Sequence, residues 1–239
     1  MLVAMQSRDK GDRLLSSFVI TSYMIKPCHA ENPACATGGF VYHVINRGNG
    51  RATIFHKAQD YQAFLSILAL AKARHPVKMF GFSLMPNHFH FVIEASHHQS
   101  LSRFMQWLLT SHVRRYHKHY GSSGHVWQGR FKSFPVQRDE HLLMVLRYVL
   151  QNPVRSGLAA SIDDWPWSSC CRNELPEPCP VEVETNWLAH VDEPLSASQV
   201  ASIRQSVNRQ TPFGEPDWQT TIAGLFGLES TMRPGADPL

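Results

Sequence analysis

Hydrophobic positions along the chain follow two different periods, and each change of period marks the end of an expected element. From Gly39 to Asn46 the positions alternate and are rich in β-branched and aromatic residues, which is typical of a strand. Between Tyr61 and Leu68 the apolar residues are spaced at i, i+3, i+4 and i+7. This spacing predicts an amphipathic helix over Lys57 to Arg74.

Residues 75–151 contain two further helical patterns and three further extended patterns. Val77 to Met85 and Phe89 to Glu94 are expected to be strands, and Ser100 to Tyr120 a second helix. His125 to Val136 is predicted to be extended. Asp139 to Gln151 is predicted to be a third helix, because an Asn-Pro pair follows it and proline restricts the residue before it.

The order strand, helix, strand, strand, helix, strand, helix predicts an α+β fold, a ferredoxin-like antiparallel sheet with packed helices. Three regions are expected: an uninformative N-terminal extension (1–37), a main domain (38–175) and a C-terminal region (176–239). The C-terminal region begins with a proline-rich linker. It continues with two short helical patterns, Ser196 to Arg209 and Pro216 to Leu228, which predict a small, mostly helical unit.

Composition places the chain among globular proteins of the cell interior. It has 239 residues, of which 43% are hydrophobic and 18% charged. Its five cysteines form no CxxC pair, which favours reduced thiols and a cytoplasmic location. The longest apolar run, Phe64 to Ala71, is too short to span a bilayer, so no membrane partner is expected.

Charge is distributed unevenly along the sequence. Ala95 to Arg138 contains no acidic residue but seven lysines and arginines, whereas Asp163 to Pro194 contains eight acids and one arginine. A basic segment of this kind suits a phosphate backbone, because each contact releases condensed counterions. A solvated helix face is the alternative. We therefore expect a nucleic acid, with its phosphate backbone, as the partner.

Two histidines stand in the most distinctive strand pattern, Pro86 to Glu94. Because side chains alternate along a strand, His88 and His90 point to one face, and Phe89 and Phe91 point to the other. Two imidazoles in this arrangement can bind one divalent cation. Two packed or surface histidines are the alternative.

The tyrosines can be sorted by helix geometry. Tyr116 continues the buried stripe of the second helix, and Tyr120 lies at the end of that helix. Tyr148 is predicted to lie away from the apolar face of the third helix, and Asn152 follows one turn later on the same side. This pair suits a nucleophile beside a metal ligand. The alternative is a surface tyrosine and an asparagine that ends the helix.

Together these segments resemble the single-tyrosine HUH transposases of bacterial insertion sequences, and especially the REP-associated tyrosine transposases. The resemblance covers about Gly38 to Ser169. It rests on the segments Tyr42-His43-Val44-Ile45-Asn46-Arg47-Gly48, Met85-Pro86-Asn87-His88-Phe89-His90, Val126-Trp127-Gln128-Gly129-Arg130-Phe131, Arg147-Tyr148-Val149-Leu150-Gln151-Asn152-Pro153-Val154-Arg155 and Trp165-Pro166-Trp167-Ser168-Ser169. The chain departs from the family at Pro27 to Pro33, where the family often has a basic stretch.

The resemblance implies the HUH endonuclease fold and a role for each site residue. His88 and His90 would be the ligands of Mg²⁺ or Mn²⁺, Asn152 the third ligand and Tyr148 the nucleophile. The residues expected to contact DNA are Arg47, Arg103, Arg114, Lys118, Trp127, Arg130 and Lys132. Ordinary core packing is the alternative for Trp127.

The resemblance also implies the reaction and the partner, which are the cleavage and rejoining of single-stranded or hairpin DNA. A tyrosine attacks the phosphorus and keeps the 5′-phosphate, so that a 3′-hydroxyl can later reverse the step. The alternatives are a domesticated DNA-binding protein of the same family that no longer cleaves, and a metal-dependent hydrolase unrelated to DNA. The sequence also leaves a homodimer open.

Overall fold

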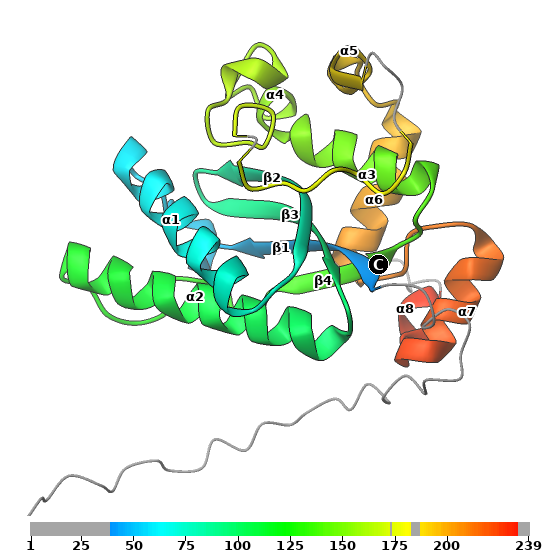
Figure 1. Ribbon diagram of the computed structural model, residues 1–239, viewed down its shortest axis with the longest axis horizontal. Helices are drawn as coiled ribbons and strands as arrows, with labels where there is room; N and C mark the ends of the chain where they lie inside the picture. The colour runs from blue at the N-terminus through cyan, green and yellow to red at the C-terminus, as the bar shows by residue number, and fades with distance from the viewer. Residues whose placement is uncertain (1–38, 173, 183–186, 234–239) are drawn as a thin grey trace, which may run out of the picture.

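The structure is a computed structural model that describes residues 39–172, 174–182 and 187–233. Its centre is a four-stranded sheet (Figure 1) in the order β2-β3-β1-β4. The strands are β1 (Phe40–Arg47), β2 (Lys78–Met85), β3 (His88–Ala95) and β4 (Lys132–Val136). Every neighbouring pair is antiparallel. This is the ferredoxin-like strand order, and the predicted fold class is confirmed.

Helices α1 (Ala58–Arg74) and α2 (His98–Tyr120) cover one face of the sheet (Figure 1). Phe64 and Leu108 on these helices are fully buried and belong to the same core cluster as Phe89 and Phe91 on β3. The apolar side of each helix therefore packs against one face of the sheet, as the sequence predicts. Because α1 and α2 occupy this face, any site on the sheet has to use the other.

The opposite face is covered by α3 (Glu140–Leu150) and α6 (Ala197–Arg209) (Figure 1). Val145 on α3, Ile203 on α6 and Phe134 on β4 are almost wholly buried in a second core cluster. The short helix α4 (Asn152–Arg155) follows α3 after Gln151. Helix α3 is thus packed between the sheet and elements from the C-terminal region.

The remaining described elements are short. They are η2 (Asn49–Arg51), η3 (Ile162–Asp164), α5 (Trp187–Asp192), α7 (Pro216–Phe226) and α8 (Glu229–Met232). The prediction of an extended segment over residues 125–136 is right only for β4. Upstream of β4, Gly124 and Gly129 adopt positive φ angles, and these turns prevent a continuous strand.

Segments from the C-terminal half of the chain cover parts of both outer strands. Along β2, the Leu84 amide donates to Trp167 O at 2.9 Å, and the Ser169 amide donates to Phe82 O at 3.0 Å. Along β4, Phe213 exchanges backbone hydrogen bonds with Pro135 and Gln137, both at 2.9 Å. The elements after residue 175 therefore pack directly on the sheet and on α3.

The boundary near residue 175 stays a prediction, and the predicted extension 1–37, including Pro27 to Pro33, lies outside the described residues. Among the helices that the structure describes, none has the length and apolar character needed to cross a membrane.

Candidate active site

The two histidines of the strand motif lie on the face of the sheet that α3 covers. His88 opens β3 and is half-buried, and His90 is 3% exposed. Their ring centroids are 5.1 Å apart. Phe89 and Phe91 point into the opposite core, as the alternation predicts. The two imidazoles are therefore close enough to share one ligand.

A third histidine, His43 on β1, joins this pair and was not singled out from the sequence. Its Nε2 lies 2.9 Å from Nδ1 of His90, and the two rings stack at 5.1 Å. His43 is fully buried, and its Nδ1 has no hydrogen-bond partner among the described residues. Because His43 engages Nδ1 of His90, it leaves Nε2 of His90 as the nitrogen that can bind a ligand.

Burial keeps all three imidazoles neutral. It lowers the pKa of His43 to about 3. Burial, with a smaller contribution from the Arg47 charge, lowers the pKa of His88 to about 4. Burial and the neighbouring His43 and His88 hold the pKa of His90 well below its usual value. Neutral imidazoles carry the free lone pair that metal ligation requires.

Tyr148 on α3 faces the histidines, but the prediction that it lies off the buried face is wrong. The side chain is 6% exposed and belongs to the second core cluster. Its ring makes edge contacts with His90 at 5.9 Å and His43 at 6.2 Å between centroids. Helix α3 is buried on a wide arc, because it contacts the sheet, α5 and α6. The single apolar stripe in the sequence of α3 could not reveal that Tyr148 is buried.

Asn152 is the first residue of α4 and is 7% exposed. Its Oδ1 accepts a 2.7 Å hydrogen bond from Nη2 of Arg155. Its Nδ2 is buried without a partner among the described residues. The asparagine therefore lies one turn from Tyr148 with part of its amide unsatisfied.

The register of the sheet brings two basic residues beside the histidines. Arg47 pairs with His88 in the β1–β3 ladder, and Ile45 pairs both with His90 and, on the other side, with Lys132. Directly paired residues lie on the same face, so Lys132 and Arg47 both share the face of the histidines. The Nε of Arg47 is buried and unpartnered among the described residues.

The other predicted basic contacts lie at the surface. Arg103, Arg114, Lys118 and Arg130 are exposed, the first three on α2 and the last before β4. Trp127 differs, because it is 5% exposed and packs against Phe89 and His112 with ring centroids 5.3 Å apart in both cases. The core-packing alternative describes Trp127, whose ring is buried and leaves little surface for contact with DNA.

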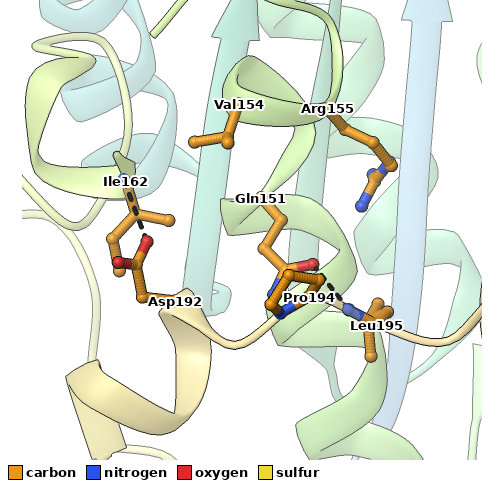
Figure 2. A pocket seen from close by; sticks show the side chains of 7 residues that line it. All are labelled: Gln151, Val154, Arg155, Ile162, Asp192, Pro194 and Leu195. Atoms are coloured by element: carbon orange, nitrogen blue, oxygen red, sulfur yellow. Dashed lines mark hydrogen bonds between the residues drawn. The ribbon is translucent and has the colours of Figure 1, made fainter. Parts of the chain in front are cut away.

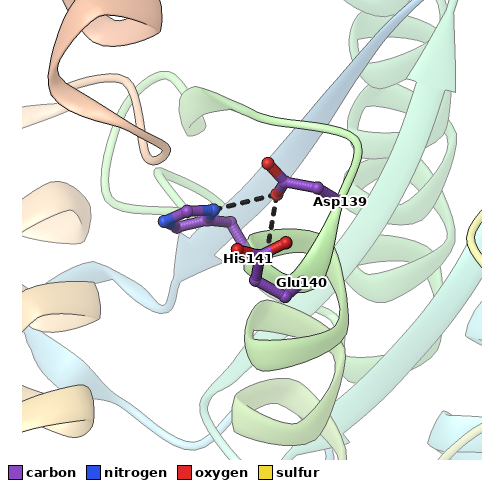
Figure 3. Close-up of side chains that lie close together, drawn as sticks. All are labelled: Asp139, Glu140 and His141. Atoms are coloured by element: carbon purple, nitrogen blue, oxygen red, sulfur yellow. Dashed lines mark hydrogen bonds and ion pairs between the residues drawn. The ribbon is translucent and has the colours of Figure 1, made fainter.

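Asp139, Glu140 and His141 form a second cluster of metal-ligand types (Figure 3). The Oδ1 of Asp139 accepts from the backbone amide of His141 at 2.9 Å and lies 2.8 Å from its ring Nδ1. Asp139 thus caps the start of α3. Tyr148 is nine residues further along, or about 13 Å at the helical rise. The cluster therefore lies apart from the histidine pair.

A ferredoxin-like sheet with a His-x-His pair on an inner strand, facing a tyrosine carried by a helix, is the arrangement expected of the HUH fold. The model of the family "Transposase IS200 like" matches residues 37–152, and this segment of the chain belongs to that transposase family. The family implies DNA endonuclease chemistry.

Two curated relatives are REP-associated tyrosine transposases. A candidate member from Haemophilus influenzae is 26% identical over 41% of this chain. One from Escherichia coli is 21% identical over 57% of the chain. The matches span 62% and 79% of those two proteins. A solved REP-associated tyrosine transposase bound to a REP hairpin aligns over 67% of this chain and 94% of its own, with 19% identity and a TM-score of 0.45.

Proposed function

We propose that this protein cuts and rejoins single-stranded, hairpin-bearing DNA through a phosphotyrosine formed on Tyr148. The observation that carries the proposal is the contact of the Tyr148 ring with both His90 and His43. These residues come from α3, β3 and β1, so packing brings Tyr148 beside His90, one of the two proposed metal ligands, and beside His43, which engages Nδ1 of His90. A cytoplasmic location is part of the proposal, because such a substrate lies in the cell interior.

The donor set fits a divalent cation. His88 and His90 are neutral imidazoles on one face, and Nδ1 of His90 is already fixed by His43. The carbonyl oxygen of Asn152 has two lone pairs, so it can accept from Arg155 and still serve as a ligand. When bound there, Mg²⁺ or Mn²⁺ would offset charge on the phosphate and on the departing oxygen.

The phenol of Tyr148 performs the covalent step. Its oxygen loses a proton and forms a bond to phosphorus, while the bond from phosphorus to the 3′-oxygen breaks and that oxygen leaves as a hydroxyl. The 5′-phosphate remains on the tyrosine, and the same atoms reverse the step when a second 3′-hydroxyl attacks. No net hydrolysis occurs. The buried position of Tyr148 helps to exclude water from the phosphotyrosine.

Exposed basic side chains supply the DNA path. Lys132 lies in the same row of the sheet as His90, and Arg47 pairs with His88. Arg103, Arg114 and Lys118 extend along α2. Because α2 covers the opposite face of the sheet, a backbone that contacts both groups has to pass around an edge of the sheet.

A DNA-binding protein that no longer cleaves is the second candidate. Two observations favour it: Tyr148 is only 6% exposed, and Oδ1 of Asn152 already accepts from Arg155. Either the site opens when DNA binds, or it has lost the reaction. The two candidates share the fold and the basic surface, so they differ only in the covalent product.

The deciding experiment uses a labelled pool of DNA hairpins with randomised single-stranded flanks, incubated with the full chain and Mn²⁺. A denaturing gel then detects DNA joined covalently to protein. Under the proposal, wild type gives this adduct, whereas Tyr148→Phe and wild type with EDTA do not. Tyr116→Phe is the matched control, because Tyr116 bonds His56 at 3.0 Å on another part of the chain and should retain the adduct. Binding without an adduct in wild type would establish the second candidate.

A further inference from the structure

Arg155, the last residue of α4, connects the residues of the candidate site to one another. Its Nη2 donates to the backbone oxygen of Tyr148 at 2.8 Å and to Oδ1 of Asn152 at 2.7 Å. Its guanidinium carbon lies 4.3 Å from the centroid of the Tyr148 ring. One side chain therefore contacts the proposed nucleophile through its ring and backbone, and the proposed amide ligand through its side chain.

The guanidinium also has binding capacity that the protein does not use. Nη1 of Arg155 is buried and has no hydrogen-bond partner among the described residues. Across the described ranges no carboxylate forms an ion pair with Arg155. Burying a charge without an opposite charge is costly, and a buried N–H donor without an acceptor adds to that cost. Such a group is expected to meet an anion.

Arg155 also lines a pocket (Figure 2). Figure 2 shows its lining from α4, the end of α3 and the segment after α5, and Arg155 is the one cation among the lining side chains. The lining residues are Gln151, Val154, Arg155, Ile162, Asp192, Pro194 and Leu195. Arg155 therefore both lines this pocket and lies against the ring of Tyr148.

A guanidinium presents five N–H donors in a planar fork that matches phosphate oxygens. In Arg155 two of the interactions are used inside the protein, toward Tyr148 O and Asn152 Oδ1, and the Nη1 donors remain. Helix capping alone would use the bond to Tyr148 O, but it would not explain a buried and unused nitrogen beside the tyrosine ring.

We propose that Arg155 binds the DNA phosphate that Tyr148 attacks, and that it holds Tyr148 and Asn152 in place for this step. The inference rests on the proposed function and adds a residue to it. It assigns two separable roles to one side chain: a charge that contacts the phosphate, and a fork that positions the nucleophile.

Two substitutions separate these roles. Arg155→Met removes both the charge and the fork. Arg155→Lys keeps the charge but cannot bridge Tyr148 O, Asn152 Oδ1 and a phosphate at once. Arg147→Met is the matched control. Arg147 precedes Tyr148 on α3, its Nε is also buried without a partner among the described residues, and its Nη2 donates to the backbone oxygen of Glu193 at 2.8 Å.

The first measurement is binding of the hairpin pool as a function of salt, which needs no cleavage. Arg155→Met is expected to flatten the log–log slope by about 0.7, the value of one lost phosphate contact on a single strand. Arg155→Lys and Arg147→Met should keep the wild-type slope. An unchanged slope in Arg155→Met would show that Arg155 meets no phosphate and would overturn that role.

The second measurement is the rate of adduct formation with Mn²⁺, together with a thermal melt of each variant. Both Arg155 variants are expected to lose about 100-fold in rate, as for other groups that stabilise charge in a reacting centre. Arg147→Met should stay near wild type. If Arg155→Lys forms the adduct at the wild-type rate, the positioning role is overturned. This holds even if Arg155→Met forms the adduct slowly because it melts early. An absence of adduct in wild type overturns the proposed function itself, while the salt slope still decides the phosphate contact.

Discussion

Replacing His43 with phenylalanine tests whether this buried imidazole sets the metal-binding state of His90. The substitution keeps an aromatic ring at a position whose neighbours are themselves aromatic. The His43 ring lies 5.0 Å from Phe134 and 6.2 Å from Tyr148 between centroids. The substitution removes only the 2.9 Å hydrogen bond that joins Nδ1 of His90 and Nε2 of His43. The packing should therefore survive while one polar contact is lost.

The size of the effect follows from what His90 loses. Its Nδ1 would be left without a partner at a position that is 3% exposed, and a buried polar group left unsatisfied costs about 1–3 kcal/mol. The tautomer of His90 would also no longer be fixed. Changing a residue that orients a metal ligand typically reduces metal affinity by about 10–100-fold. This loss corresponds to about 1.4–2.7 kcal/mol of binding free energy.

The assay is calorimetric titration of the full chain with Mn²⁺, accompanied by a thermal melt. His112→Phe is the matched control. His112 is another buried histidine, 1% exposed, whose burial lowers its pKa to about 4. It packs against Phe64 and Trp127 in the other core, away from His90. We expect weaker Mn²⁺ binding in His43→Phe and wild-type binding in His112→Phe. Equal Mn²⁺ affinity in wild type and His43→Phe would refute the reasoning.

Three further outcomes are expected. Alanine at His88 or His90 should abolish the Mn²⁺-dependent adduct, with a larger loss of melting temperature at the more buried His90; an adduct of wild-type yield in either variant would contradict this. Removing exposed positive charges should flatten the salt dependence of DNA binding by about 0.7 per phosphate contact without unfolding, and four unchanged slopes would place the DNA elsewhere. The variants are Arg114→Ala, Lys118→Ala, Arg130→Ala and Lys132→Ala. Burial raises the pKa of Asp60, but hydrogen bonds from the Tyr120 hydroxyl at 2.6 Å and from backbone amides outweigh it and lower the pKa overall. The hydrogen-bonded carboxylate of Asp60 should therefore stabilise the fold above pH about 4. This stabilisation should be lost as the pH falls through the lowered pKa of Asp60. Denaturant melts of wild type and Asp60→Asn should therefore converge in acid.

The local part of the site could be predicted from the sequence because it depends on one strand. Alternation along residues 86–94 places His88 and His90 on one face, whatever packs against that face. The same reasoning could not find the partner of His90. The contact with His43 depends on the β1–β3 register, which pairs His43 with Val92 and Ile45 with His90 and arises only when the sheet forms.

Burial of α3 shows a second limit on what could be predicted from the sequence. From its own sequence the helix has one apolar stripe, and Tyr148 falls outside it. The structure adds contacts from α5 and α6, which lie more than 35 residues further along the chain, and the buried arc widens to include Tyr148. Trp127 is a similar case, because its aromatic surroundings come from α1, α2 and β3. The identities of the residues were informative, but their exposure depended on partners distant in sequence.

The covering of the two outer strands limits how two copies of this chain could associate. Proteins with open edge strands can join by continuing one sheet into the next, since unpaired amides and carbonyls there act as a template. Here Leu84 and Phe82 on β2 already bond Trp167 and Ser169, and Pro135 on β4 already bonds Phe213. A sheet shared by two copies would first have to displace these segments. Self-association that preserves this fold would therefore use helix or loop surfaces, leaving the row of side chains from His90 to Lys132 within a single copy.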